Sequence, residues 1–302
     1  MGDPFVGSQA LASGALTRHE LRTRFRAVHR DIYVARDARP TALLRAKAAW
    51  LRSRGHGVLA GFSASAFHGA RWIDPSLPAY VIDTNNRRPA RGIVTWGDAI
   101  GDDEICSIGD IRLTAPARTA VDLACKFPED TAVAAIDALA RAARLKVADI
   151  ELAAEHHSGR KGIKRARATI ALVDPGSESP QETWLRLLVI RAGYPRPQTQ
   201  SPVCNEYGVV IGEVDLAWPE LKIALEYEGS HHTDPETLRK DIARVDEMIE
   251  MGWIVIRVTR RDGTAKVLGR IAKSWASRVY RCGGKTIEKS PQRFIREWAP
   301  PR

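Results

Sequence analysis

The sequence predicts a multidomain α+β protein, and three observations support this prediction. The chain has 302 residues, which is too long for one small core and suits two or three domains. Hydrophobic residues make up 44% of it and charged residues 27%, as in ordinary globular proteins. The apolar pattern also changes twice, from helices with a short hairpin, to a mixed middle region, to a C-terminal region whose strands carry acids.

The first region reads as two helices followed by a hairpin. Thr17 and Glu20 have the T-x-x-E spacing of a capping box, so a helix is expected to begin there. The segment HRDIYVARD then alternates between apolar and polar residues, as a strand does. Helices followed by a β wing are the outline of a winged helix-turn-helix, which we assign to residues 1–75. A small helical cap with a solvated arginine face is the alternative. The candidates for contacts to DNA phosphates are Arg18, Arg22, Arg24 and Arg26.

The middle region, residues 76–175, is expected to be α+β. The segments AYVID, GIVTW and DIRLT predict short strands, and TAPARTAVDLACKF and EDTAVAAIDALARAARL predict helices. Nothing in this region has catalytic spacing. It ends in a basic connection, HHSGRKGIKRARATIALVDPGSESP, with a domain boundary near residue 175. Lys161 and Lys164 are candidates for a track of phosphate contacts, and a solvated helical linker explains them equally well.

The C-terminal region has a clear order of elements. The segment SPQETWLRLLVIRAGY predicts a helix capped by Ser179, with Pro180 at its first position. Three strands should follow, then the helix PETLRKDIARVDEMIEMGW, the buried strand WIVIRVT and a closing helix. The predicted order is therefore helix, three strands, helix, strand, helix. The residues expected on the core face of the first helix are Trp184, Leu187, Leu188 and Ile190.

Acidic residues stand out in GEVDLAWPELKIALEYEGSHH, residues 212–232. Ile223 and Leu225 should face one side of a strand, whereas Lys222, Ala224, Glu226 and Glu228 should face the other. Two carboxylates two residues apart on one face repel each other unless positive charge lies between them. A divalent cation is the obvious source of that charge, and Mg²⁺ prefers oxygen ligands of this kind.

The succession of these segments resembles the restriction-endonuclease-like nuclease fold. It is most similar to the DUF559 family, which is related to the very-short-patch mismatch-repair endonucleases. The resemblance rests on SPQETWLRLL, GEVDLAWPELKIALEYEGSHH and DIARVDEMIEMGWIVIRVT, over roughly residues 177–280. It implies a nuclease domain over residues 176–285, followed by a tail over 286–302. It further implies DNA cleavage in repair or defence, with Mg²⁺ or Mn²⁺ bound by Glu182, Asp215 and Glu226.

The chain departs from the usual nuclease motif at one position. The motif ends in Glu-x-Lys, whereas this sequence has Glu226 and Glu228 in those places, so the lysine that positions the water is missing. The resemblance implies that His231 or His232 serves as the base instead, and Lys222 is a second substitute. The full set of catalytic candidates is Glu182, Asp215, Glu226, Glu228, His231, His232 and Lys222.

Arg257 is a further candidate in the same region. It lies in GWIVIR, a pattern similar to one in the DUF559 family, and could be aimed at the active site or at a DNA phosphate. A salt bridge from Asp241 to Arg257 or to Arg244 explains the same residues equally well.

The N-terminal part is similar to the winged-helix domain of AbiEi-type antitoxins of type IV toxin–antitoxin systems. The similarity rests on GALTRHEL, VHRDIYVA, SASAFHGA and LTAPARTAVDLA, over roughly residues 8–125. It implies DNA binding and autoregulation of an operon. The alternative to a nuclease is therefore a non-catalytic antitoxin or transcriptional regulator that binds DNA. The acid set favours the nuclease, because a protein that only binds DNA has no need of these acids together.

Composition limits the partners. The net charge of +10 and the pI of about 9.7 favour a polyanion, here DNA, and a protein partner or a homodimer stays open. No apolar run approaches the roughly 20 residues of a membrane helix, and the first residues do not resemble a secretory signal. A cytoplasmic protein without membrane association is therefore expected. Four cysteines far apart argue against a structural zinc site and a disulfide framework.

Overall fold

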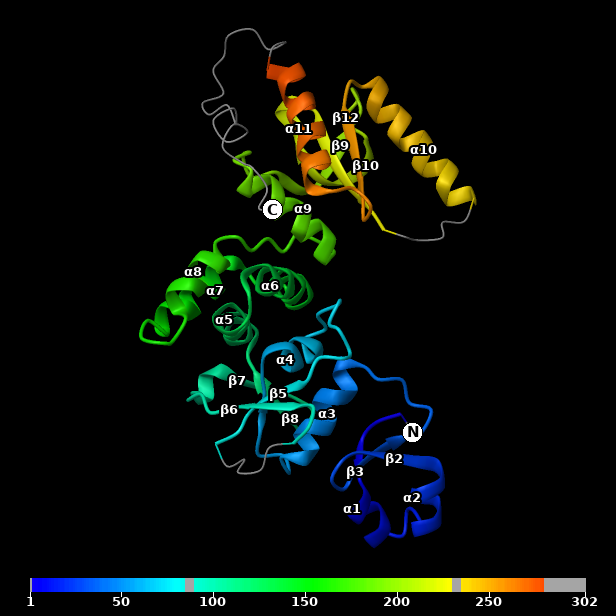
Figure 1. Ribbon diagram of the computed structural model, residues 1–302, viewed down its shortest axis with the longest axis vertical. Coiled ribbons are helices and arrows are strands. Elements are labelled where there is room, and N and C mark those ends of the chain that lie inside the picture. The colour runs from blue at the N-terminus through cyan, green and yellow to red at the C-terminus, as the bar shows by residue number, and fades with distance from the viewer. Residues whose placement is uncertain (1, 85–89, 230–234, 280–302) are drawn as a thin grey trace. The chain divides into compact units, whose positions relative to one another are not determined.

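The computed structural model describes residues 2–84, 90–229 and 235–279 (Figure 1). It confirms the multidomain α+β architecture, with helices and several separate sheets. The chain divides into two compact units, Met1–Pro175 and Gly176–Arg302. Within the described residues, no helix is long and apolar enough to cross a membrane.

The first unit opens with two short helices and a small antiparallel sheet. Its strands pair in the order β1-β3-β2, and β2 and β3 form the expected hairpin. The predicted capping box is present. Thr17 Oγ1 accepts a hydrogen bond from the main-chain N–H of Glu20, and the Glu20 carboxylate accepts one from the main-chain N–H of Thr17. The helix–helix–hairpin prediction is thus confirmed. The elements are β1 (Phe5–Val6), α1 (Gly7–Ala12), α2 (Arg18–Arg24), β2 (Phe25–His29) and β3 (Ile32–Ala35).

A five-stranded sheet follows in the same unit, in the order β6-β5-β4-β8-β7. The sequence predicted β5, β6 and β8 but not β4 or β7. Strand β4 is only two residues long, and β7 alternates weakly, so neither has a clear pattern of its own. The elements are α3 (Ala42–Arg52), β4 (Val58–Leu59), α4 (Gly61–Phe67), β5 (Ala79–Ile82), β6 (Ile93–Trp96), the 3-10 turn Asp102–Glu104, β7 (Ile105–Ile108) and β8 (Ile111–Thr114).

Four helices complete the first unit, and the last of them corrects the prediction of a linker. The basic connection contains α8, which buries Ile163, Ala166 and Ile170 in the same core as α5. Its start requires glycine, since a Cβ on Gly162 would lie 2.9 Å from the Cys125 carbonyl oxygen. The segment is therefore part of a packed core and not an open linker. The helices are α5 (Pro116–Lys126), α6 (Glu129–Ala143), α7 (Val147–His156) and α8 (Ile163–Ile170).

The second unit has the predicted order of helix, three strands, helix, strand, helix. Its sheet runs β12-β11-β10-β9, in which only β11 and β12 pair in parallel, and α10 makes the crossover between them (Figure 1). The elements are α9 (Pro180–Arg191), β9 (Gln198–Cys204), β10 (Val210–Trp218), the 3-10 turn Pro219–Leu221, β11 (Ile223–Glu228), α10 (Pro235–Glu250), β12 (Ile254–Thr259) and α11 (Thr264–Val279).

Helices cover both faces of this sheet. Ile223 and Leu225 of β11 pack with residues of α9 and α11, whereas Ala224 packs on the other face with Met248 of α10. The predicted division of β11 into two faces is therefore confirmed, but both faces are buried. Lys222 does not belong to the strand, because it ends the preceding turn in the left-handed conformation, with φ of 49°.

The core face predicted for α9 needs correction. Leu187 is buried as expected, whereas Trp184 is 37% exposed and Leu188 and Ile190 are only half-buried. The helix instead buries Leu185 and Val189 together with polar side chains, including Glu182. The spacing of apolar residues alone predicted the wrong face, because α9 also buries polar side chains such as Glu182 and Thr183.

Candidate functional site

Three of the predicted acids come together in the second unit. Leu216 of β10 pairs with Leu225 of β11, so the adjacent residues Asp215 and Glu226 project from the same face of the sheet. Glu182 lies in the first turn of α9, and its charge and that of Glu226 act on Asp215. The main-chain N–H of Tyr227 donates to Asp215 Oδ2 at 2.6 Å and so fixes the carboxylate. We call Glu182, Asp215 and Glu226 the acidic site.

Asp215 has the most unusual electrostatics of the three. Burial raises its pKa to about 7, and the negative charges of Glu182, Glu226 and Glu178 act in the same direction. The hydrogen bond from Tyr227 opposes this effect by favouring the carboxylate. Near neutral pH Asp215 is therefore partly protonated, which reduces the negative charge that the site holds.

Glu182 is held by a residue that the sequence did not indicate. Only 8% of Glu182 is exposed, and its Oε2 accepts from Gln200 Nε2 at 3.0 Å and from the main-chain N–H of Glu178 at 2.8 Å. Its Oε1 accepts from Ser179 Oγ at 2.8 Å. Gln200 has a left-handed φ of 46°, a strained backbone for a side chain of this kind. No sequence signal marks Gln200, since its role depends on how β9 lies beside α9.

Two arginines supply positive charge to the acids of β11. Arg244 of α10 donates to Glu226 Oε1 at 2.8 Å and to Asp241 Oδ1 at 2.6 Å. Arg257 of β12 donates to Asp241 Oδ2 at 2.7 Å and forms an ion pair with Glu228. Both salt bridges considered for Asp241 are thus present. The positive charge that Glu226 and Glu228 require comes from guanidinium groups in this arrangement.

The remaining catalytic candidates lie elsewhere. Lys222 stands at the beginning of β11, at the opposite end of the strand from Glu228, and its Nζ donates to the Met251 carbonyl oxygen at 3.0 Å. His231 and His232 fall outside the described residues. The structure thus brings Glu182, Asp215 and Glu226 together and keeps Lys222 apart.

The donor set fits a divalent cation in kind. Carboxylate oxygens are the ligands that Mg²⁺ and Mn²⁺ prefer, and the half-buried Asp215 lies within the influence of the negative charges of Glu182 and Glu226. Within residues 2–84, 90–229 and 235–279, however, no three His, Cys, Asp or Glu side chains form a group that could hold one ion. Binding one ion would require Glu226 to exchange its bond to Arg244 for the ion. The metal ligands therefore stay a prediction.

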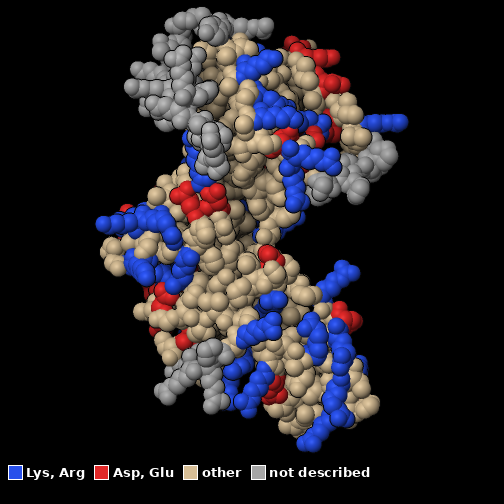
Figure 2. Space-filling model, in the orientation of Figure 1, with Lys and Arg blue, Asp and Glu red and all other residues tan. Residues whose placement is uncertain are grey.

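The basic candidates of the first unit lie mostly at its surface. Arg18, Arg22 and Arg24 are exposed on α2, whereas Arg26 is half-buried on β2 and donates to the Ala38 carbonyl oxygen at 3.3 Å. Figure 2 shows Lys and Arg side chains gathered over these N-terminal elements. Lys161 and Lys164, at the beginning of α8, are also exposed. Their contacts with DNA stay a prediction.

The middle of the chain matches a known family. Residues 58–172 match the AbiEi antitoxin C-terminal domain. This range runs from β4 through α8, so the match lies after the helix–helix–hairpin segment. The antitoxin resemblance is supported, but in the region that follows the helix–helix–hairpin segment. The nuclease resemblance of residues 177–280 has no counterpart in this match and stays a prediction.

Relatives that match most of the chain exist in Mycobacterium tuberculosis. The uncharacterized proteins Rv2248 and MT2308, from two strains, are each 30% identical to this chain over 243 residues, which is 80% of this chain and 87% of theirs. No solved structure matches the chain. The chain therefore belongs to the same family as these mycobacterial proteins, and its residues 58–172 match the AbiEi antitoxin C-terminal domain.

Proposed function

We propose that this protein is a DNA-binding regulator of the antitoxin type. The observation that carries the proposal is the match of residues 58–172 to the AbiEi antitoxin C-terminal domain, directly after a helix–helix–hairpin segment. A helix–helix–hairpin segment is the kind of element that enters or flanks a DNA groove. The excess of basic residues in the chain supports a polyanionic partner.

The helix α2 is the first surface to test. Its capping box holds the beginning of the helix, and Arg18, Arg22 and Arg24 are exposed along it. Arg24 Nη1 lies 3.6 Å from a Glu20 oxygen, a surface pair of little energetic weight, so its charge remains available to a phosphate. Arginine binds phosphate through a planar fork of donors, which suits backbone contacts.

The experiment measures duplex DNA affinity between about 50 and about 200 mM salt, where counterion release dominates the salt dependence. The wild type is compared with the variant Arg18→Gln/Arg22→Gln/Arg24→Gln. We expect the slope of log affinity against log salt to become shallower by about 0.9 for each phosphate that an arginine no longer neutralises. An unchanged slope would exclude α2 from the interface. Wild-type protein without affinity for duplex DNA would contradict the proposal and direct attention to a protein partner.

A second function, DNA cleavage by the second unit, is favoured by one observation. Asp215 lies half-buried beside Glu182 and Glu226, an arrangement that destabilises its own charged form. Such an arrangement is common where carboxylates serve chemistry and less so where they serve packing. The proposal takes Mg²⁺ or Mn²⁺ as the ion.

In this second proposal the acidic site holds the ion and its neighbours hold the acids. Glu182, Asp215 and Glu226 would be the ligands, Gln200 orients Glu182, and Tyr227 orients Asp215 through its main-chain N–H. When bound, such an ion supplies polarisation of a phosphoryl oxygen and a more acidic water. Arg244 would have to release Glu226 and could then contact the DNA phosphate.

The test compares Asp215→Asn with Asp246→Asn, an exposed position on α10. Plain, mismatched, branched and single-stranded DNA are incubated with Mg²⁺ and with Mn²⁺. Asp215→Asn should abolish cleavage and keep DNA binding, because the amide preserves shape and removes the charge. Asp246→Asn should cut as the wild type does. Wild-type protein that cuts none of these substrates would contradict the second function and leave the regulator.

A further inference from the structure

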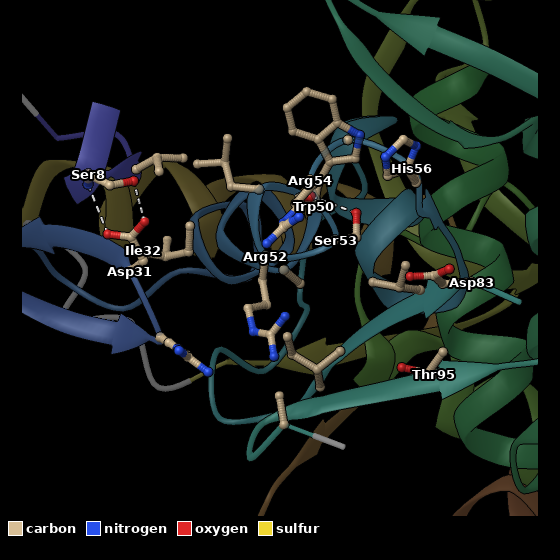
Figure 3. A pocket seen from close by; sticks show the side chains of 18 of the residues that line it. Ser8, Asp31, Ile32, Trp50, Arg52, Ser53, Arg54, His56, Asp83 and Thr95 are labelled. Atoms are coloured by element: carbon tan, nitrogen blue, oxygen red, sulfur yellow. Dashed lines mark hydrogen bonds between the residues drawn. The ribbon is translucent and has the colours of Figure 1, made fainter. Parts of the chain in front are cut away.

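A hollow of about 1150 Å³ lies in the first unit, outside the α2 surface (Figure 3). Its walls come from the tip of the β2–β3 hairpin, from the end of α3 and from strands β5 and β6. Arg30 stands at the hairpin tip, and Arg52, Arg54 and His56 stand at and just after the end of α3. Elements far apart in the sequence therefore bring basic side chains to one concave surface.

The hollow is lined by three arginines, Arg30, Arg52 and Arg54, and by two acids, Asp31 and Asp83. Within the described residues, Arg30, Arg52 and Arg54 form no ion pair. The lining acid nearest the hairpin tip, Asp31, already accepts from the main-chain N–H of Ser8 at 2.9 Å and from its Oγ at 2.5 Å (Figure 3).

The charge also acts on a neighbouring histidine. Burial lowers the pKa of His29, and the positive charges of Arg52 and Arg45 lower it further. This shift agrees with positive charge near the hairpin tip, at the side of the hollow where Arg52 lies.

The backbone at Arg54 is strained. Arg54 has φ of 56° and Gly55 has φ of 76°, where the chain leaves α3. The main-chain N–H of Gly55 donates to the Trp50 carbonyl oxygen, which closes the end of the helix. Glycine or asparagine adopts this conformation most easily, and another residue costs on the order of 1 kcal/mol. Arg144 has the same conformation, with φ of 52°, so it offers a matched position for comparison.

Trp50 adds an unused donor to the same wall. Its indole ring lines the hollow beside Arg54 and His56 (Figure 3). The Nε1 atom is buried and has no hydrogen-bond partner among the residues that the structure describes. A buried N–H without an acceptor is costly, so this wall of the hollow carries an unsatisfied donor.

We propose that this hollow binds the phosphate backbone of duplex DNA, with Arg30, Arg52 and Arg54 as the contacts. The proposal rests on the DNA-binding function above and gives that function a second surface. A duplex carries one charge per about 1.7 Å of its axis, so it can contact cations spread over a hairpin tip and a helix end. Strand β2 of this hairpin begins directly after α2, so the hairpin connects the two surfaces along the chain.

The test compares a variant of the hollow, Arg52→Gln/Arg54→Asn, with a matched control, Arg112→Gln/Arg144→Asn. We call the first of these the groove variant. Both pairs remove two arginines from the first unit, and Arg54 and Arg144 share the left-handed conformation, with φ of 56° and 52°. Asparagine tolerates this conformation, so each variant keeps its backbone. The salt slope of duplex binding should fall by about 1.8 in the groove variant, because each neutralised phosphate contributes about 0.9. The control should keep the wild-type slope.

The same change in slope predicts how much affinity each protein loses as the salt concentration rises. Between about 50 and about 200 mM salt, wild-type affinity should fall roughly tenfold more than that of the groove variant. If the wild type binds and both variants keep its slope, the hollow is not a DNA site, although the regulator proposal survives. If the wild type binds no duplex at low salt, the DNA-binding proposal itself fails, and the hollow proposal with it.

A second measurement avoids substitution altogether, in case the groove variant fails to fold. Wild-type protein is treated with phenylglyoxal, and modification of Arg52, Arg54 and Arg112 is quantified by mass spectrometry. Duplex DNA should protect Arg52 and Arg54 at least several-fold more than Arg112. Equal modification would overturn the proposal. The proposal would also be overturned if duplex DNA gave Arg52 and Arg54 no protection while inorganic phosphate at the same ionic strength, or polyglutamate, protected them.

Discussion

Asp215 shows how one residue links the fold to pH. Its pKa is about 7 in the folded chain against an ordinary value of 3.8. As pH rises from about 4 to about 7, the unfolded chain releases a proton that the folded chain retains, so folding stability falls. Above this range the full cost is present, on the order of 4 kcal/mol from the shift of about three pKa units. Below it Asp215 is neutral in both states and costs nothing.

Asp215→Asn should therefore stabilise the protein in a pH-dependent way. We expect a gain of up to about 4 kcal/mol in the free energy of unfolding at about pH 8, and roughly 1.5 kcal/mol at about pH 5. The measurement is denaturant unfolding of the second unit in EDTA at both pH values. Asp246→Asn, which is exposed, should change little at either. An equal gain at both pH values would mean that ionisation of Asp215 is not the cause.

At the scale of elements, the capping box of α2 gives the clearest prediction. Thr17 and Glu20 satisfy each other's main-chain N–H groups at the beginning of a seven-residue helix. Thr17→Ala removes one of these bonds and should lower the stability of the first unit by about 1 kcal/mol. Urea unfolding checks this, and duplex affinity should fall with it if α2 contacts DNA.

Thr23 provides the matched control on the same helix. Its hydroxyl donates to the His19 carbonyl oxygen, which is already within the helix, so no end group depends on it. Thr23→Ala should be neutral or slightly stabilising, because alanine is the better helix former. A loss of stability as large as that of Thr17→Ala would show that the hydroxyl matters for another reason than capping.

The elements also show which features the sequence could predict. Capping residues and apolar periods placed α2, α9 and the whole order of the second unit, because these signals are local. The face of α9 was partly wrong and α8 was taken for a linker, because both depend on what packs against them. The acids were found because charged residues in an apolar strand are conspicuous. Gln200 and the hollow near Trp50 were missed, because distant segments create them.

At the scale of the whole molecule, each compact unit has its own apolar core. The core of the first unit gathers around α5 and the five-stranded sheet. The core of the second lies on the two faces of its four-stranded sheet, under α9 and α11 on one side and α10 on the other. Units with separate cores of this size commonly unfold as separate cooperative transitions.

Scanning calorimetry of the full chain should therefore show two transitions, each sensitive to one variant. Thr17→Ala should lower the midpoint of the first unit alone, since the capping box belongs to α2. Asp215→Asn at about pH 8 should raise the midpoint of the second unit alone, because the cost of the buried charge lies there. Duplex DNA should raise the midpoint of the first unit if α2 and the hollow bind it, since a ligand stabilises the unit that holds it. A single transition that both variants shift would instead mean that the two cores unfold together, and the energetic independence inferred from their separate packing would be wrong.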